Sequence, residues 1–206
     1  MLLRPAFRFI DHGPLVDREL ELVPAQPRWA DDVLAACHHP LTVAQMPREA
    51  RLSRTDIDQF LAEAPFGRFP GDPVAGRVPS YQFWMLLRHS ADSRWRPPPI
   101  RIAGGLSLRV GSNPSVELHY GHVGYHVYPP ARGHRYAYRA ARLVLPLLRA
   151  HGLPVAWITC DPDNHPSRRT IERLGGRYVE TVPVPEHDPL YARGETHKCR
   201  FRLDLR

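Results

Sequence analysis

The segment from Val127 to Ala137 constrains the fold of this chain more than any other stretch. A strand pattern ends at Tyr128, where two prolines stop it, and a short loop containing Gly133 leads directly into an amphipathic helix. Such a junction aims unpaired backbone N–H groups and the positive end of a helix dipole at one point. The segment therefore predicts a site for a diphosphate, although an ordinary strand-to-helix turn has the same pattern.

Strands and helices alternate along the rest of the chain. Strands are predicted at residues 19–23, 80–88, 101–110, 119–128, 154–160, 178–184 and 197–205. Helices are predicted at residues 29–38, 53–64, 137–151 and 164–174. The apolar run at 154–160 is typical of a strand buried on both faces. The segment 65–79 is rich in Gly and Pro, which is typical of a loop, and we expect it to lie over a substrate site. This order predicts an α/β (α+β) class built on one mixed sheet, and 206 residues fit a single domain over 1–206.

Composition narrows the classes of partner. The net charge of +7 suggests nucleic acid at first sight, but the positive charge is scattered arginine, with Lys198 as the only lysine and no basic block. We therefore expect no nucleic-acid partner. No apolar run approaches the roughly 18 residues that a membrane span needs, so no membrane partner is expected either. An odd number of distant cysteines (Cys37, Cys160 and Cys199) is typical of reduced thiols and predicts a cytoplasmic protein.

The loop at residues 132–137 resembles the acetyl-CoA motif of the GCN5-related N-acetyltransferase (GNAT) family. That motif opens with Arg or Gln, has Gly three positions later, and has Gly or Ala two positions beyond. Arg132 and Ala137 match its ends, whereas position 135 is Arg where Gly is usual. Because the loop binds through backbone N–H groups, a side chain is tolerated at 135 if φ stays negative and the side chain points outward.

A second segment, from Asn164 to Gly175, is similar to the family signature in which an Asn and a small residue open the last helix beside the pantetheine arm. The resemblance narrows to a subgroup of bacterial predicted acetyltransferases of unassigned substrate, on segments 78–80, 83–84, 101–104, 121–125 and 159–161 together with Arg109 and Asn113. It implies a mixed central sheet of six to seven strands with helices on both faces. Two central strands would splay apart to admit the cofactor.

The resemblance implies an N-acetyltransferase that binds acetyl-CoA and transfers its acetyl group to an amine by direct attack in a ternary complex. Backbone amides around Tyr125 would polarise the thioester carbonyl. The implied cofactor-binding residues are Tyr125, His126, Val127, Arg132, Gly133, His134, Arg135, Tyr136, Ala137, Asn164 and Ser167. We expect a small-molecule amine as acceptor, and a monomer or homodimer.

Two other functions stay open. The chain could be a catalytically silent acyl-CoA-binding regulator, because the family's usual acid, a Tyr on the last helix, corresponds here to Ile171. It could also modify RNA or protein. A deep acidic pocket would favour a polyamine or aminosugar acceptor, and an open basic groove would favour RNA.

Several residues compete for the catalytic roles. His119, Glu117 and His122 are candidates for the general base, and we favour His122, which lies three residues before Tyr125 on the predicted strand. Cys160 and Ser167 are the candidates that could replace the missing acid.

The three histidines of the predicted strand 119–128 suggest a metal ion at first sight. On a strand, however, His119 and His122 would point to opposite faces, and His122 and His126 would lie about 13 Å apart. We therefore expect no metal site.

Overall fold

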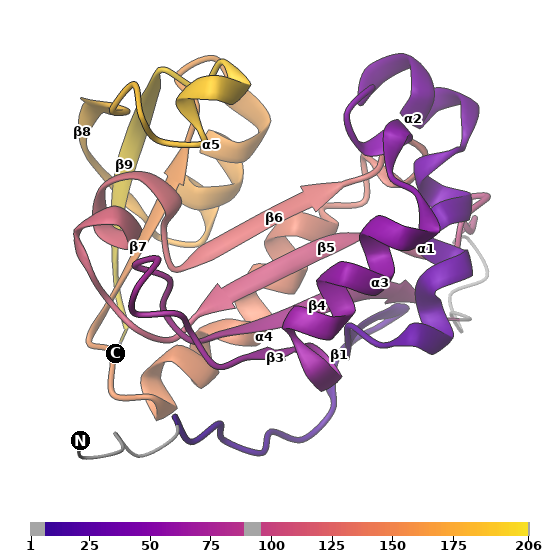
Figure 1. Ribbon diagram of the computed structural model, residues 1–206, viewed down its shortest axis with the longest axis horizontal. Coiled ribbons are helices and arrows are strands. Elements are labelled where there is room, and N and C mark those ends of the chain that lie inside the picture. Colours follow the sequence, from indigo (N-terminus) through magenta and orange to yellow (C-terminus); the bar gives the residue numbers. More distant parts are fainter. Residues whose placement is uncertain (1–6, 89–95, 206) are drawn as a thin grey trace.

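The structure is a computed structural model that describes residues 7–88 and 96–205 (Figure 1). Its strands are β1 (Leu15–Asp17), β2 (Leu20–Pro24), β3 (Arg68–Phe69), β4 (Ser80–Leu87), β5 (Ile102–Arg109), β6 (Val123–Val127), β7 (Val155–Cys160), β8 (Arg177–Pro183) and β9 (His197–Asp204). Its α-helices are α1 (Ala30–Cys37), α2 (Pro40–Gln45), α3 (Arg54–Glu63), α4 (Tyr136–Ala150) and α5 (His165–Arg173). This combination confirms the α/β (α+β) class.

The strands form two sheets in place of the single mixed sheet of the sequence prediction. The larger has six strands in the order β1-β2-β4-β5-β6, with β3 beside β4, and the smaller has the order β7-β9-β8. All pairings given for the described strands are antiparallel. The two sheets meet near His122, whose N–H donates to the Trp157 carbonyl at 2.6 Å. Beyond that bond β6 and β7 diverge, which is the splaying that the resemblance implied (Figure 1).

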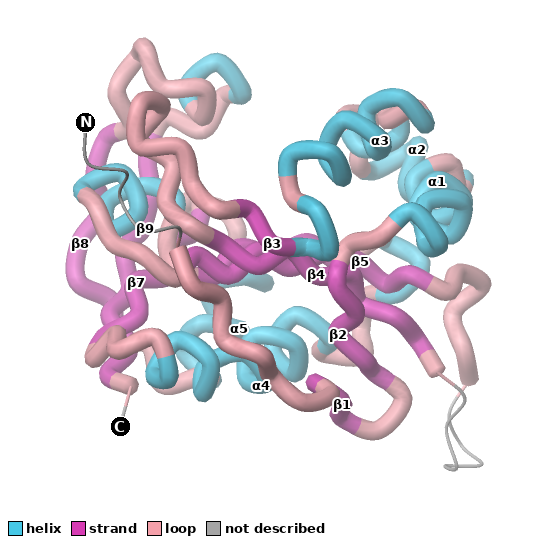
Figure 2. The backbone as a smooth tube through the Cα atoms, turned by 60° about the horizontal axis from the view of Figure 1, so that its bottom comes forward, coloured by secondary structure: helices cyan, strands magenta, loops and turns pink. Residues whose placement is uncertain are grey.

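Helices cover both faces of the larger sheet: α1 and α3 lie on one side and α4 on the other (Figure 2). The start of α3 is a capping box, in which the Ser53 Oγ accepts from the Asp56 N–H and the Asp56 carboxylate accepts from the Ser53 N–H. This box, with Asp in place of the usual Glu, explains why the helix predicted at residues 53–64 begins where it does.

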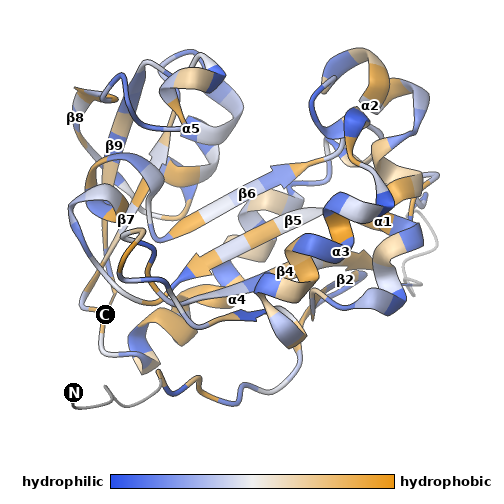
Figure 3. Cartoon of the chain, viewed as in Figure 1, coloured by the Kyte–Doolittle hydropathy of each residue, from blue (hydrophilic) through white to orange (hydrophobic). Residues whose placement is uncertain are grey.

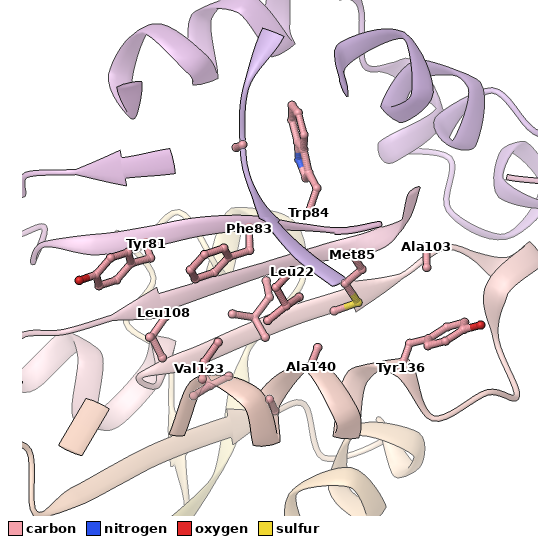
Figure 4. Close-up of a cluster of buried hydrophobic side chains, with 14 of the residues drawn as sticks. Leu22, Tyr81, Phe83, Trp84, Met85, Ala103, Leu108, Val123, Tyr136 and Ala140 are labelled. Carbon is pink, nitrogen blue, oxygen red and sulfur yellow. The ribbon is translucent and has the colours of Figure 1, made fainter. Parts of the chain in front are cut away.

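Buried apolar residues lie on both faces of the larger sheet, and one layer of this core lies between the sheet and α4. Tyr81, Met85, Leu108 and Val123 point from the strands toward Ala140 of the helix (Figure 4). Apolar residues occur on β5 and α4, which contact each other (Figure 3). Full burial of each large apolar side chain contributes about 1.5–3 kcal/mol, so this layer holds α4, and the loop before it, against the sheet.

The predicted strand at 119–128 is wrong in its first half. Residues Val116–Tyr120 form a π-helical turn, which the Asn113 side chain opens by accepting from the Val116 N–H at 2.9 Å. Gly121 then reverses the chain at φ +68, where a Cβ would lie 3.1 Å from backbone atoms of β7. The strand therefore begins only at Val123, and His119 belongs to the turn.

Two further predictions need correction. β7 is not buried on both faces: Ala156, Ile158 and Cys160 are buried, and the residues between them are partly exposed. The reason is that successive side chains of a strand point to opposite faces, and only one face of β7 packs into the core. The segment 65–79 is not wholly loop, because Arg68–Phe69 pairs with β4. No helix within the described residues combines the length and apolar character required to cross a membrane.

Candidate functional site

Two cavities meet where β6 faces α5. The sheet cavity, of about 580 Å³, lies over β4, β5 and β6, and the loop cavity, of about 540 Å³, lies between the segment 131–137 and α5. The residues that line both are Tyr125, His126, Asn164 and Ser167. A molecule in one cavity can therefore reach a molecule in the other beside Tyr125.

The loop cavity brings together most of the predicted cofactor residues. Its wall includes Arg132, Gly133, Arg135, Tyr136 and Ala137 at the start of α4. The N–H groups of a helix's first turn have no partner within the helix, so this wall offers donors and a positive dipole end to an anion.

Other residues of the loop cavity were not predicted, and one predicted residue does not line it. The unpredicted residues are Met46, Ala131, Pro166 and Thr170. Pro166 and Thr170 could have been found from the helical spacing of the Asn164 signature. His134 is absent from both walls, and its ring stacks on Tyr136 with centroids 5.2 Å apart.

Arg135 does not have the negative φ on which the sequence analysis made a side chain at this position conditional. Its backbone is left-handed, at φ +57 and ψ +29, directly before the first residue of α4. Gly133 is also left-handed, at φ +91. The chain turns sharply to enter α4, which explains the family's preference for Gly at position 135, since an L-residue is strained there by about 1–2 kcal/mol.

The α5 side of the site is organised by two side-chain bonds. Asn164 caps the helix, because its Oδ1 accepts from the Ser167 N–H at 3.1 Å. The Ser167 Oγ lies 3.0 Å from the Tyr125 hydroxyl, so this pair of hydroxyl groups joins β6 to α5. Burial raises the pKa of Tyr125 to about 12, so its hydroxyl keeps its proton at neutral pH.

The backbone of β6 directs donors into the gap between the sheets. The Tyr128 N–H donates to Ala103 of β5, and β5 pairs along the whole of β6. Successive residues of an antiparallel strand point their N–H groups to opposite sides. The N–H groups of Tyr125 and Val127 therefore face away from β5, toward the opening beside α5.

His122 lies outside both cavities. Its side chain is 1% exposed, and its Nδ1 accepts from the Trp157 N–H at 2.9 Å. Burial lowers the pKa of His122 to about 4, so the imidazole stays neutral. Two hydrogen bonds to Trp157 make it a bridge between the two sheets.

The competing base candidates occupy different places. His119 lines the sheet cavity, and its Nε2 lies 3.2 Å from the Pro183 carbonyl. Because a carbonyl can only accept, Nε2 carries the proton and Nδ1 keeps a lone pair. Glu117 lines neither cavity, and its carboxylate accepts from the Ser112 hydroxyl at 2.5 Å.

Cys160 lies in the wall of the sheet cavity, at the end of β7. Burial raises the pKa of its thiol to about 11, so it is protonated at neutral pH. Ile171, at the position of the family's acid, is fully buried in the core. Within the described part of the chain, no three His, Cys, Asp or Glu side chains gather closely enough to hold a metal ion.

The floor of the sheet cavity is formed by residues that were not singled out as a group. Gln82 and Ser107 are paired across β4 and β5, and the Ser107 hydroxyl donates to the Gln82 side chain at 2.6 Å. Single polar residues between large apolar ones, as in Tyr81-Gln82-Phe83 and Leu106-Ser107-Leu108, were the available signal.

Comparison with known proteins gives one family and many structures of the same fold. A family model described as an acetyltransferase (GNAT) domain matches residues 19–177, whereas no curated protein matches the chain. The structure is similar to a GNAT-family acetyltransferase from Bacillus anthracis (TM-score 0.61, 15% identity, 94% of this chain and 99% of that chain). It is also similar to the microcin C7 self-immunity acetyltransferase MccE, solved with acetyl-CoA and AMP (TM-score 0.63, 14% identity, 93% of this chain and 94% of that chain). A third similar structure is RimL, a ribosomal L7/L12 α-N-protein acetyltransferase solved with coenzyme A (TM-score 0.64, 13% identity, 94% of this chain and 98% of that chain).

Proposed function

Because the chain belongs to the GNAT acetyltransferase family, we propose that it transfers an acetyl group from acetyl-CoA to the amine of a small molecule. The observation that supports this most is the meeting of the two cavities at Tyr125 and Ser167. The loop cavity would hold the donor and the sheet cavity the acceptor, so that the amine attacks directly in a ternary complex.

The residues of the loop cavity fit coenzyme A. Its diphosphate requires several hydrogen-bond donors, which the N–H groups at the start of α4 supply together with Arg135. Arg132 is held by the Val127 carbonyl at 3.2 Å and by the Gln45 side chain at 3.0 Å, which orders the loop. The bound donor supplies the activated acetyl thioester.

The N–H groups of Tyr125 and Val127 would stabilise the oxyanion. They project from a strand that β5 holds in place, so they need no rearrangement when charge develops on the thioester oxygen. The hydroxyl pair of Tyr125 and Ser167 would then return a proton to the departing sulfur. Tyr125 is protonated at neutral pH, as a proton donor must be.

We propose His119, rather than His122, as the general base. His119 lies in the wall of the sheet cavity with Nδ1 as its free lone pair, whereas His122 is sealed between the sheets. A base must reach the proton that it removes, directly or through one water molecule.

The test is a panel of amines added to the protein with acetyl-CoA, with release of free thiol as the measurement. We expect at least one amine to accelerate thiol release, and His119→Gln to reduce that rate. Binding of acetyl-CoA without acceleration by any amine would instead support the silent acyl-CoA-binding regulator. That alternative is favoured by one observation, the burial of Ile171 where the family has its acid.

A further inference from the structure

We infer that the acceptor carries an anionic group, a carboxylate or a phosphate, which the Arg109 guanidinium binds in the sheet cavity. This inference rests on the proposed function and specifies its substrate class. It starts from one side chain that the proposed chemistry does not use.

Arg109 is the last residue of β5, and its guanidinium lies over the cavity floor. A Cβ on Gly124 of β6 would lie 3.3 Å from its Nη1, so the missing side chain there leaves room for it. The same Nη1 donates to the carbonyls of Tyr120 and Gly121 at 3.3 and 3.1 Å. These two bonds and the Tyr120 ring, 5.6 Å from the guanidinium carbon, fix the direction of the side chain. Among the described residues, no side chain accepts a hydrogen bond from its other N–H groups.

No carboxylate in residues 7–88 and 96–205 forms an ion pair with Arg109. Its side chain is partly buried, and this burial lowers its pKa. A partly buried cation whose partners are two carbonyls and the ring face of Tyr120 has no opposite charge beside it, and a bound anion would supply that charge.

The acids of the sheet cavity are already engaged. Asp161 and Glu195 both accept from the Lys198 ammonium, Asp161 at 2.5 Å. The cavity wall therefore holds three cations, Arg109, Arg193 and Lys198, against these two acids, an excess of one positive charge. Such a wall does not suit a polyamine, and Arg109 and Arg193 are the charges left to attract an anion.

Arg109 is also separated from the donor. It lines the sheet cavity and not the loop cavity, so the coenzyme diphosphate is held elsewhere. The planar fork of a guanidinium matches the paired oxygens of a carboxylate or phosphate. An acceptor with an amine near Tyr125 and an anionic group at Arg109 would use both ends of the cavity.

The experiment compares amines that differ only in the anionic group: β-alanine with propylamine, phenylalanine with phenethylamine, and phosphoethanolamine with ethanolamine. We expect the anionic member of at least one pair to have a kcat/KM about 10- to 100-fold higher, the range of one hydrogen bond to a charged group. The first two pairs report a carboxylate and the third a phosphate.

Three variants test whether Arg109 causes the preference for an anionic group. Arg109→Gln should abolish it while acetyl-CoA affinity is kept, and Arg109→Lys, which retains the charge, should keep part of it. Arg202→Gln is the matched control, since Arg202 is an exposed arginine on β9 outside both cavities.

The outcomes separate this inference from the proposed function. Turnover without preference for the anionic amines, or a preference that persists in both Arg109 variants, overturns the inference and leaves acetyl transfer standing. If no amine is acetylated, calorimetry with the same six compounds in the presence of coenzyme A tests directly whether the anion site binds them. Binding of an anionic compound that Arg109→Gln abolishes supports the anion site and rejects transfer to these amines, and absence of such binding overturns the site as well.

Discussion

His122 is a buried imidazole that joins the two sheets through Trp157. Because burial lowers its pKa to about 4, from an ordinary value of 6.5, the folded protein keeps this imidazole neutral while the unfolded chain protonates it. The unfolded state therefore binds more protons as the pH falls from about 6.5 to about 4, and stability decreases across that window.

The wild type should accordingly lose about 2 kcal/mol more unfolding free energy between pH 7 and pH 5 than His122→Gln. Urea unfolding of both proteins at the two pH values measures this, and the other titrating groups cancel in the difference. Parallel losses would show that His122 is accessible to protons. A large fall in kcat in His122→Gln, with acetyl-CoA affinity kept, would return it to the catalytic candidates.

We expect replacement of His119 to affect catalysis, whereas replacement of His122 affects the pH dependence of stability. Removal of its imidazole by His119→Gln is expected to lower kcat about 100-fold with acetyl-CoA affinity unchanged, because only the transfer step loses its base. Steady-state kinetics and calorimetric titration measure the two quantities separately. An equal loss of affinity and stability would mean that its bond to Pro183, and not its lone pair, is what matters.

The proposed role of the Tyr125 hydroxyl in proton transfer can also be tested. Tyr125→Phe removes one member of the hydroxyl pair with Ser167 and leaves the backbone N–H in place. We expect kcat to fall about 10- to 100-fold while acetyl-CoA still binds. Ser167→Ala is the companion variant, and unchanged kcat in both would assign the proton transfer to Cys160 or to water.

At the scale of elements, the strained backbone at the start of α4 coincides with the proposed site for the donor diphosphate. Arg135→Gly should raise the free energy of unfolding by about 0.5–1 kcal/mol, since Gly adopts the left-handed conformation without strain but is more flexible when unfolded. Arg135→Ala keeps the strain and should leave stability near that of the wild type.

The same pair of variants separates backbone from side chain in binding. If the guanidinium contacts phosphate, both Gly and Ala should weaken acetyl-CoA binding by about 1.5–3 kcal/mol in calorimetry. Arg135→Pro should disrupt the junction in either case, because proline cannot adopt a positive φ. A destabilised Arg135→Gly variant would show that the side chain has a structural contact that outweighs the strain.

At the scale of the whole molecule, binding of the donor between two elements should stabilise the fold. At a hundredfold excess over Kd, acetyl-CoA should raise the free energy of unfolding by about 2.7 kcal/mol. For a chain of this length that corresponds to roughly 5–10 °C in Tm, measured by calorimetry or a dye-based melt. Adenosine alone, which lacks the diphosphate, is the control, and an unchanged Tm with millimolar acetyl-CoA would contradict the proposed donor.

Residues close together in the sequence account for the local structures and for the proposed donor half of the site. The capping box at Ser53, the junction before α4 and the Asn164 cap of α5 each depend on residues a few positions apart. Hydrogen bonds and helix dipoles over such distances depend on which residue types follow one another, so they can be predicted from the sequence. For that reason most residues predicted for the donor do line one cavity.

Which residues line the proposed acceptor cavity could not be predicted from residues close together in the sequence. His119 and His122 are three positions apart, yet the turn at 116–120 and the positive φ of Gly121 place one in a cavity wall and the other between two sheets. The proposed role of Arg109 likewise depends on the absence of a carboxylate partner among the described residues. Burial, dielectric surroundings and missing partners depend on packing between distant segments, and short-range patterns do not contain that information.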